Sequence, residues 1–293
     1  MGITFGQQGY HFWTARVSLL VLRYLCLDVR IGYRIERSDT LSNDVVRYNN
    51  GFNTVPLRQF SPVEMDIFWS ICSKMKRKGT DEITFDFETF KELANYNRRE
   101  KEGFYKALKT LSDKLGSLTY KFEDEDEFEQ LWLFQRFYIS KKNETVTIQA
   151  SERFEFILNS IGNDFTRFEL ENITQLSSGY TKELYRQLMS HRDRKSRKGA
   201  WFVRVEDFRS VMQVPQSFRM TNIDKRIFDV AEKEFTTPNK LGEVIFSEFK
   251  IEKVKARKGN KISSFRIFFK EPDVLTVPMT NWLESNEESN NAK

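Results

Sequence analysis

The sequence predicts an α+β protein built from two tandem winged helix-turn-helix domains that are related by an internal pseudo-repeat. From residue 60 onward, the chain shows the order helix, strand, helix, turn, helix, hairpin twice. The third helix of each copy carries one apolar stripe at helical spacing. A length of 293 residues is enough for two domains of ordinary size.

The same patterns divide the chain into four parts. We expect an extension over 1–40, a first winged-helix domain over 41–150, a second over 151–272 and an acidic tail over 273–293. The extension shares no clear periodicity with the rest of the chain. One explanation is that translation begins at Leu41, and the intact mass of protein made from the native gene would test this expectation.

The first copy opens with Ser61-Pro62-Val63-Glu64, which supplies an N-cap serine, a proline at the first helical position and a glutamate for a capping box. A short strand over 82–87 and a second helix follow. After a turn at Asn95-Tyr96-Asn97, we expect Asn97 and Glu100 to cap the third helix. Its apolar stripe consists of Phe104, Leu108, Leu111 and Leu115.

The hairpin of the first copy is expected to pair 118–122 with 131–140, and 145–149 is a candidate third strand. Its tip would then be the acidic run over 123–129. Because carboxylates repel phosphate, such a tip argues against DNA contact by this wing. The run fits either a solvated loop tip or a docking patch for a basic protein partner.

The second copy repeats the order. Its expected elements are a helix over 170–192 bent at Ser178-Gly179, a basic loop over 192–199, a strand over 201–205, a short helix near Phe208, a turn over 214–217, a helix over 221–235 and a hairpin pairing 244–254 with 262–270. The stripe of helix 221–235 is Ile223, Ile227, Val230 and Ala231, and Thr221 with Asp224 resembles a capping box.

Charge is distributed unevenly along the chain. The net charge is +5, and the second domain alone carries +7. Basic residues gathered in one half of a chain are typical of a protein that contacts phosphate backbone.

Several enzyme classes lack their motifs here. The two histidines, His11 and His191, stand 180 positions apart, so no clustered histidine pair can hold a metal. We find no P-loop, no G-x-S-x-G and no C-x-x-C motif. The sequence therefore predicts a binding protein that is not an enzyme and has no cofactor or metal. Two cysteines and no membrane-spanning run favour the reducing cytoplasm.

A helix that fits the major groove, flanked by basic segments, is the physical basis for predicting DNA binding. Asn reads adenine and Arg reads guanine in bidentate fashion, so Asn222 and Arg226 are the candidate base readers. The turn between the last two strands is the candidate phosphate-binding wing. The full set of candidate DNA-binding residues is Arg98, Arg99, Lys101, Lys106, Lys109, Arg192, Arg194, Lys195, Arg197, Lys198, Arg219, Asn222, Lys225, Arg226, Lys233, Lys253, Lys255, Arg257, Lys258 and Lys261.

Several segments together resemble the plasmid replication initiators of the iteron-binding type, the initiator Rep (Rep_3) family. They are Val45-Val46-Arg47-Tyr48-Asn49-Asn50 through Pro56-Leu57-Arg58, Phe60 to Glu64, Phe165 to Leu170, Tyr180 to Tyr185, and Trp201 through Asp224-Lys225-Arg226 to Phe235. The similarity covers about 43–270, and the ordered combination is more specific than any one segment.

This resemblance implies two winged-helix domains that bind short direct repeats in double-stranded origin DNA. It also implies opening of adjacent AT-rich DNA, recruitment of the host initiator and replicative helicase, autorepression, and a homodimer formed through the first domain. Helix 221–235 and its wing would be the main reading unit, and helix 98–115 would supply a second contact or part of a dimer surface. The implied location is the bacterial cytoplasm, on the plasmid or nucleoid. Residues 1–40 and the acidic run depart from the family pattern.

Two other functions stay open at this point. A winged-helix transcriptional repressor would show the same fold and charge pattern, and the position of its binding sites would distinguish it. A DNA-nicking initiator would need a tyrosine nucleophile with a metal cluster, which the histidine count argues against.

Overall fold

The computed structural model describes residues 44–55, 57–76, 78–96, 101–117, 119–123, 126–159, 165–239 and 242–273. The predicted extension, the start at Leu41, the tail beyond Asp273, and the caps Asn97 and Glu100 lie outside these residues. None of the helices in the described ranges is long and apolar enough to cross a membrane.

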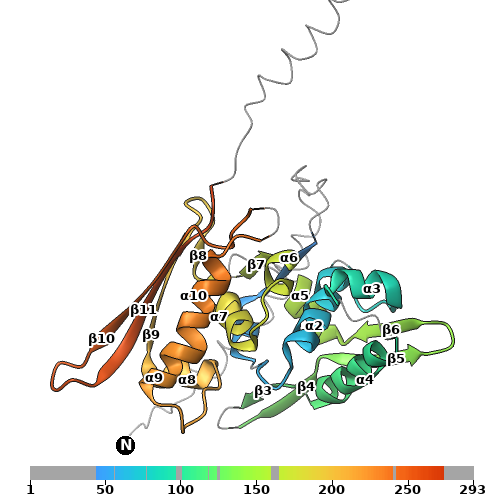
Figure 1. Cartoon of the computed structure of the whole chain (residues 1–293). Coiled ribbons are helices and arrows are strands. Elements are labelled where there is room, and N and C mark those ends of the chain that lie inside the picture. Colours follow the sequence, from blue (N-terminus) through green and yellow to red (C-terminus); the bar gives the residue numbers. More distant parts are fainter. Residues whose placement is uncertain are drawn as a thin grey trace, which may run out of the picture. The chain divides into compact units, whose positions relative to one another are not determined.

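The first winged-helix domain has the predicted order of elements (Figure 1). Its elements are α2 (Pro62–Met75), β2 (Ile83–Asp86), α3 (Phe87–Leu93), α4 (Lys101–Ser117), β3 (Thr119–Glu123), β4 (Phe128–Trp132), β5 (Phe134–Ser140) and β6 (Thr145–Ala150). The predicted capping box opens α2: the Ser61 hydroxyl accepts from the Glu64 N–H at 3.3 Å, and Glu64 Oε2 accepts from the Ser61 N–H at 2.7 Å. The apolar stripe of α4 is buried as predicted.

The predicted hairpin of the first domain is wrong in its pairing. Strand β3 pairs with β4, while β5 pairs with β6, and β6 also pairs with β2. The segment 131–140 is interrupted at Leu133, whose side chain is buried in the core and only 1% exposed. The Leu133 carbonyl accepts a hydrogen bond from the Ser151 N–H at 3.0 Å instead of pairing within a strand. The winged-helix sheet is therefore β2-β6-β5, and its wing is the turn over 141–144.

The second winged-helix domain repeats this topology. Its elements are α7 (Gly179–Ser190), β8 (Arg192–Asp193), β9 (Lys198–Arg204), α8 (Val205–Val211), a helical run made of α9 (Met220–Ile223), η3 (Asp224–Phe228) and α10 (Asp229–Thr236), and strands β10 (Glu248–Lys255) and β11 (Ile262–Lys270). The sheet order is β10-β11-β9-β8. In both domains, the strand after the wing pairs with the strand before it and with the strand before the helix-turn-helix. The predicted pseudo-repeat is confirmed at the level of sheet topology.

Two predicted segments of the second domain differ in the structure. The expected long helix over 170–192 is two helices, α6 (Leu170–Thr174) and α7, because the Ser178 hydroxyl accepts from the Thr181 N–H at 3.3 Å and starts α7 afresh. The expected basic loop over 192–199 is a short hairpin in which β8 pairs with the start of β9.

The helical run 220–236 contains a π-helical turn, η3. The extra residue in this turn lets two consecutive side chains, Ile227 and Phe228, both face the core. The Phe228 ring lies 5.4 Å from the Phe208 ring and 5.0 Å from the Phe265 ring, so it joins the helix to the sheet. The predicted cap by Thr221 and Asp224 is wrong, since the run begins after Arg219.

A buried polar junction lies between α2 and α7. Strand β1 (Val45–Asn49) pairs with β7 (Phe165–Glu169), and α5 (Glu152–Asn159), α2 and α7 pack beside them. Within this junction, Lys182 Nζ on α7 lies 2.5 Å from Asp66 Oδ1 on α2, and Lys182 is fully buried. Arg186 donates to the carbonyl oxygens of η2 (Asn50–Thr54) and of Val55. The domain limit predicted at residue 150 stays a prediction.

Candidate nucleic-acid interface

The helical run 220–236 presents a polar face to solvent. Ile223, Ile227, Ala231 and Phe235 are buried against the sheet. The exposed residues of the same run include Lys225, Arg226, Asp229, Glu232 and Lys233. A helix held by one apolar face with cations on the other is the geometry that a major-groove reading helix requires.

Arg226 lies on the polar face of the helical run. Its side chain is exposed, and its guanidinium carbon lies 5.1 Å above the Phe218 ring. Stacking on an aromatic ring restricts the guanidinium without using its five N–H donors. Arg226 therefore remains the candidate for bidentate contact with guanine.

Asn222 is a weaker candidate than the sequence suggests. Its Oδ1 accepts from the Arg219 N–H at 3.1 Å, and the residue is half-buried at the start of the helical run. Bidentate readout of adenine needs both the oxygen and the amide of the side chain. Reading adenine would therefore require the hydrogen bond to Arg219 to break. Arg219 itself is exposed.

Lys253 is exposed and also has an intramolecular contact. Its Nζ lies 2.6 Å from Asp224 Oδ2, so this ion pair ties strand β10 to the π-helical turn η3. The register puts Lys253 opposite Phe265, on the helix-covered face of the sheet. The ion pair holds the helix against the wing strand. Phosphate contact by Lys253 stays a prediction.

The wing of the second domain keeps most of its predicted cations in solvent. Lys255, Arg257, Lys258 and Lys261 are exposed around the turn that joins β10 to β11. The Ala256 N–H donates to the Lys261 carbonyl at 2.8 Å and closes this turn. Gly259 adopts a φ of +86°, a conformation that side chains disfavour. The turn therefore presents four cations on a compact loop.

The basic hairpin over 192–198 lies at the other end of the sheet from this wing. Lys198 pairs with Lys270 at one end of β11, whereas the wing leaves β11 at Ile262. Eight residue steps of ~3.3 Å separate the two ends by roughly 26 Å. The structure therefore does not bring this hairpin and the wing together (Figure 1).

Within that hairpin, three of the predicted arginines have intramolecular contacts. Arg192 Nη1 lies 3.0 Å from Glu271 Oε1, and Arg197 Nε lies 3.8 Å from Glu271 Oε2. The Arg194 guanidinium stacks 3.4 Å from the centroid of the Phe165 ring, and burial lowers its pKa. Lys195 and Lys198 are exposed. Arg194 is exposed as well. Direct DNA contact by the arginines of this hairpin stays a prediction.

In the first domain, Lys106 and Lys109 lie exposed on α4. Lys101 begins α4, while Arg98 and Arg99 lie outside the described residues. Sequence reasoning missed Lys141 and Lys142, which form the wing turn of this domain. Lys141 Nζ lies 2.6 Å from Glu102 Oε2, and this hydrogen bond raises the Lys141 pKa.

The acidic run is not at the wing of the first domain. It lies at the tip of the separate β3-β4 hairpin, where Asp126 and Glu127 are exposed. The argument that acidic residues keep this wing from DNA is therefore wrong. Two adjacent lysines between the last two strands, Lys141-Lys142, were the available signal for the true wing.

The described residues hold no group of three or more His, Cys, Asp or Glu that could bind a metal ion. Cys72 is buried, and burial raises the pKa of its thiol. Burial also raises the pKa of Tyr185 well above its usual value, so this hydroxyl is a poor nucleophile.

Comparison with known proteins relates this geometry to a family. The family model described as Initiator Replication protein, WH1 matches residues 45–189, and the model described as Initiator Rep protein, WH2 matches residues 204–269. A curated relative, "Probable replication protein rep" of Bifidobacterium longum (strain NCC 2705), is 34% identical over 179 residues. This match spans 60% of the chain and 59% of the relative, less than two thirds of either.

A solved structure shares the fold. The crystal structure of the Pi initiator protein in complex with iteron DNA aligns with a TM-score of 0.63 and 16% sequence identity. The alignment covers 79% of this chain and 98% of that chain. Because these two models match residues 45–189 and 204–269, the chain belongs to the initiator replication protein family, with one WH1 and one WH2 winged-helix domain.

Proposed function

We propose that this protein initiates plasmid replication by binding direct repeats in double-stranded origin DNA. One observation carries the proposal: two winged-helix domains each present a helix with exposed cations and a lysine-bearing wing, in a chain of the initiator replication protein family. The Pi initiator, which shares the fold, has been seen with iteron DNA.

In this proposal, the helical run 220–236 enters one major groove and α4 enters another. Arg226 reads a guanine, and Lys225 and Lys233 flank it. The wing cations at 255–261 bind phosphates and set the register of the complex. Lys106 and Lys109 on α4 add a second, weaker contact. A direct repeat long enough to span two successive grooves is the DNA site that this pair of domains would fit.

Filling several repeats would bend or strain the neighbouring AT-rich DNA, because deformation energy can be drawn from the added contacts. The finer steps belong to this proposal as well: origin opening, recruitment of the host initiator and replicative helicase, autorepression, homodimer formation through the first domain, and action in the bacterial cytoplasm on the plasmid. Permanganate footprinting of supercoiled origin DNA tests the opening step.

A transcriptional repressor is the second candidate, since the same interface would serve at a promoter. Mapping the protected sites separates the two functions: protection restricted to the promoter would favour the repressor. We also propose that the protein acts without catalysis. Incubation of supercoiled origin DNA with Mg²⁺ or Mn²⁺ should produce no open circles, and their appearance would contradict this part of the proposal.

A further inference from the structure

The first domain carries an extra β-hairpin, formed by β3 and β4 between α4 and β5. In the described part of the chain, these two strands pair only with each other. None of the described residues between α10 and β10, the corresponding place in the second domain, forms a strand. The winged-helix sheet β2-β6-β5 is complete without this hairpin. The repeated fold therefore does not account for the side chains that the hairpin carries.

One face of the hairpin presents exposed aromatic side chains. Phe128, Gln130 and Trp132 share a face of β4, because alternate residues of a strand point the same way. Phe128 is 61% exposed and Trp132 is 55% exposed. With Phe156 on α5, β4 and α5 carry three of the five large hydrophobic residues that are exposed in the described part of the chain. Exposed apolar residues gathered in one region are typical of a surface that contacts a partner.

A hollow of about 870 Å³ lies between β4 and α5, and we call it the first-domain hollow. Its apolar lining is Leu131 and Trp132 of β4, Phe134 of β5 and Phe156 of α5. The Phe134 ring lies 4.9 Å from the ring of the buried Phe154, so this part of the lining is anchored in the core. A volume within about 300–1,000 Å³ is usual for a binding site. The hollow can therefore take up apolar side chains of a partner.

The charges around the first-domain hollow are mainly negative. Glu152 and Glu155 line it, together with one cation, Arg153. The acidic run over 123–129, which includes Phe128, holds six acids and no cation. A partner that combines apolar side chains with positive charge complements both features of this surface.

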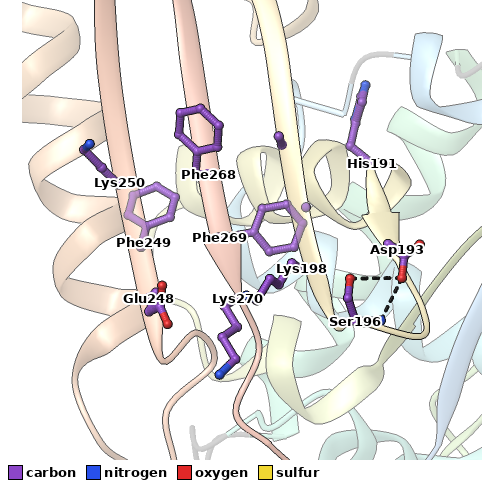
Figure 2. Close-up of a pocket in the computed structure, with 12 residues that line it drawn as sticks. His191, Asp193, Ser196, Lys198, Glu248, Phe249, Lys250, Phe268, Phe269 and Lys270 are labelled. Atoms are coloured by element: carbon purple, nitrogen blue, oxygen red, sulfur yellow. Dashed lines mark hydrogen bonds between the residues drawn. The ribbon is translucent and has the colours of Figure 1, made fainter.

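A hollow on the sheet of the second domain has the opposite charge. Its aromatic lining is Phe249, Phe268 and Phe269, and its charged lining residues are three lysines and two acids (Figure 2). Like charges disfavour a basic partner at that hollow. The sign of the charge therefore selects the first-domain hollow for such a partner.

We propose that the hairpin face and the first-domain hollow bind a basic amphipathic helix of another protein. Its apolar side chains enter the hollow and pack on Trp132 and Phe128, while its lysines or arginines face Glu152, Glu155 and the acidic run. Phe128 and Trp132 are four residues apart on a strand, which is about 13 Å. Apolar side chains at i, i+4 and i+7 of a helix span about 10 Å, a comparable length.

A second copy of this chain fits the surface less well. A two-fold contact places the same surface of both copies together, and here it would join two acidic surfaces that repel each other. The inference goes beyond the proposed function, because binding of the helix needs no DNA. It also uses no residue that is assigned to the nucleic-acid interface.

The test measures the fluorescence anisotropy of a labelled peptide of about 18 residues, or five helical turns, mixed with the full chain. The peptide contains only leucine and lysine, with leucine at helical spacing. We expect the chain to bind it and not to bind a counterpart in which glutamate replaces every lysine. Trp132→Ala should weaken binding about 5-fold or more, because aromatic anchors carry much of the energy of an interface. Glu152→Lys should weaken binding and flatten its dependence on salt.

The matched control is Tyr138→Ala, which removes a 50% exposed aromatic residue from β5 of the same domain. This variant should bind the lysine peptide as the unmodified chain does. Absence of binding by the unmodified chain would overturn the inference, as would equal binding of the two peptides. Equal binding by Trp132→Ala and the unmodified chain would also overturn it, and so would an equal loss in Tyr138→Ala.

Sedimentation of the unmodified chain and of Trp132→Ala tests a second copy as the occupant. A dimer that dissociates in Trp132→Ala would assign this face to a second copy and overturn the inference. The same proteins are measured on duplex direct repeats, where Trp132→Ala should match the unmodified chain. Peptide binding without binding of the repeats would contradict the proposed function alone, and the reverse result would overturn this inference alone.

Discussion

Lys182 Nζ on α7 and Asp66 Oδ1 on α2 lie 2.5 Å apart in a buried polar junction between these two helices. Lys182 also donates to the Ile173 carbonyl at 2.6 Å, so its ammonium has two fixed partners. The pair fixes how the two helices pack, because each charge is buried and needs the other nearby.

Removing one member of this pair should destabilise the fold strongly. We expect Asp66→Leu to lower the free energy of unfolding by about 3–5 kcal/mol, since it leaves a buried ammonium without its carboxylate. The double variant Asp66→Leu with Lys182→Met should be more stable than Asp66→Leu alone. Urea unfolding followed by circular dichroism measures both. If the loss of unfolding free energy in the double variant equals the sum of the losses in Asp66→Leu and in Lys182→Met, the two residues are not coupled.

Stability should also depend on pH through Asp66. Burial raises the pKa of this carboxyl from its usual 3.8 to about 7, and the attraction of Lys182 only partly offsets that rise. A raised folded-state pKa favours the fold fully below about pH 4, and this contribution is lost as pH rises through about 7. Burial also lowers the Lys182 pKa. The stabilisation linked to this shift is present above the usual pKa of 10.5 and is lost as pH falls.

The comparison that isolates this effect uses Asp66→Asn, which cannot titrate. Between about pH 4 and pH 7, the unfolding free energy of the native chain should fall relative to that of Asp66→Asn. Parallel curves for the two proteins over that range would mean that the Asp66 pKa is not raised.

Gly199 should tolerate no side chain. A Cβ at this position would meet the Phe269 ring and would lie 2.8 Å from the His191 carbonyl oxygen, so Gly199→Ala should cost about 1–3 kcal/mol of stability. The matched control is Gly116→Ala near the end of α4, where a Cβ has open space and alanine favours the helix. Thermal unfolding should show opposite shifts in Tm. An unchanged Tm for Gly199→Ala would show that the Phe269 ring can move aside.

Residues that contact bases and residues that contact phosphates should respond differently to substitution. Arg226→Ala should cost about 1–3 kcal/mol on the specific duplex and relax discrimination at one base pair. Lys258→Ala on the wing should weaken binding to all sequences alike and flatten the dependence on salt. Anisotropy titrations of specific and random duplexes measure both. An equal loss on the two duplexes for Arg226→Ala would refute its assignment as a base reader.

The order of elements was predictable because local signals set it. The Ser61–Glu64 capping box and the α4 stripe depend on residues within a few positions of each other, and both are confirmed. The strand pairing of the first domain was not predictable in the same way. The break at Leu133 goes with its burial and with the hydrogen bond from the Ser151 N–H to its carbonyl, and nothing in the local alternation marks it.

The candidate site was predicted in its residue types more than in its geometry. The exposed cations of helix 220–236 and its wing lie where the sequence placed them. Other predicted cations have acidic partners that the sequence did not indicate. Lys253 pairs with Asp224, and Arg192 pairs with Glu271, which is 79 positions away. Charge counting cannot separate a cation that faces solvent from one with a distant acidic partner.

The most direct test of the central claim is fluorescence-anisotropy binding across a salt series. The two ligands are the direct repeats that flank the protein's own gene and a shuffled duplex of the same composition. We predict strong preference for the repeats, with affinity that falls steeply as salt rises. Equal and weak binding to both duplexes would contradict it and would leave the basic second domain as a nonspecific phosphate-binding surface.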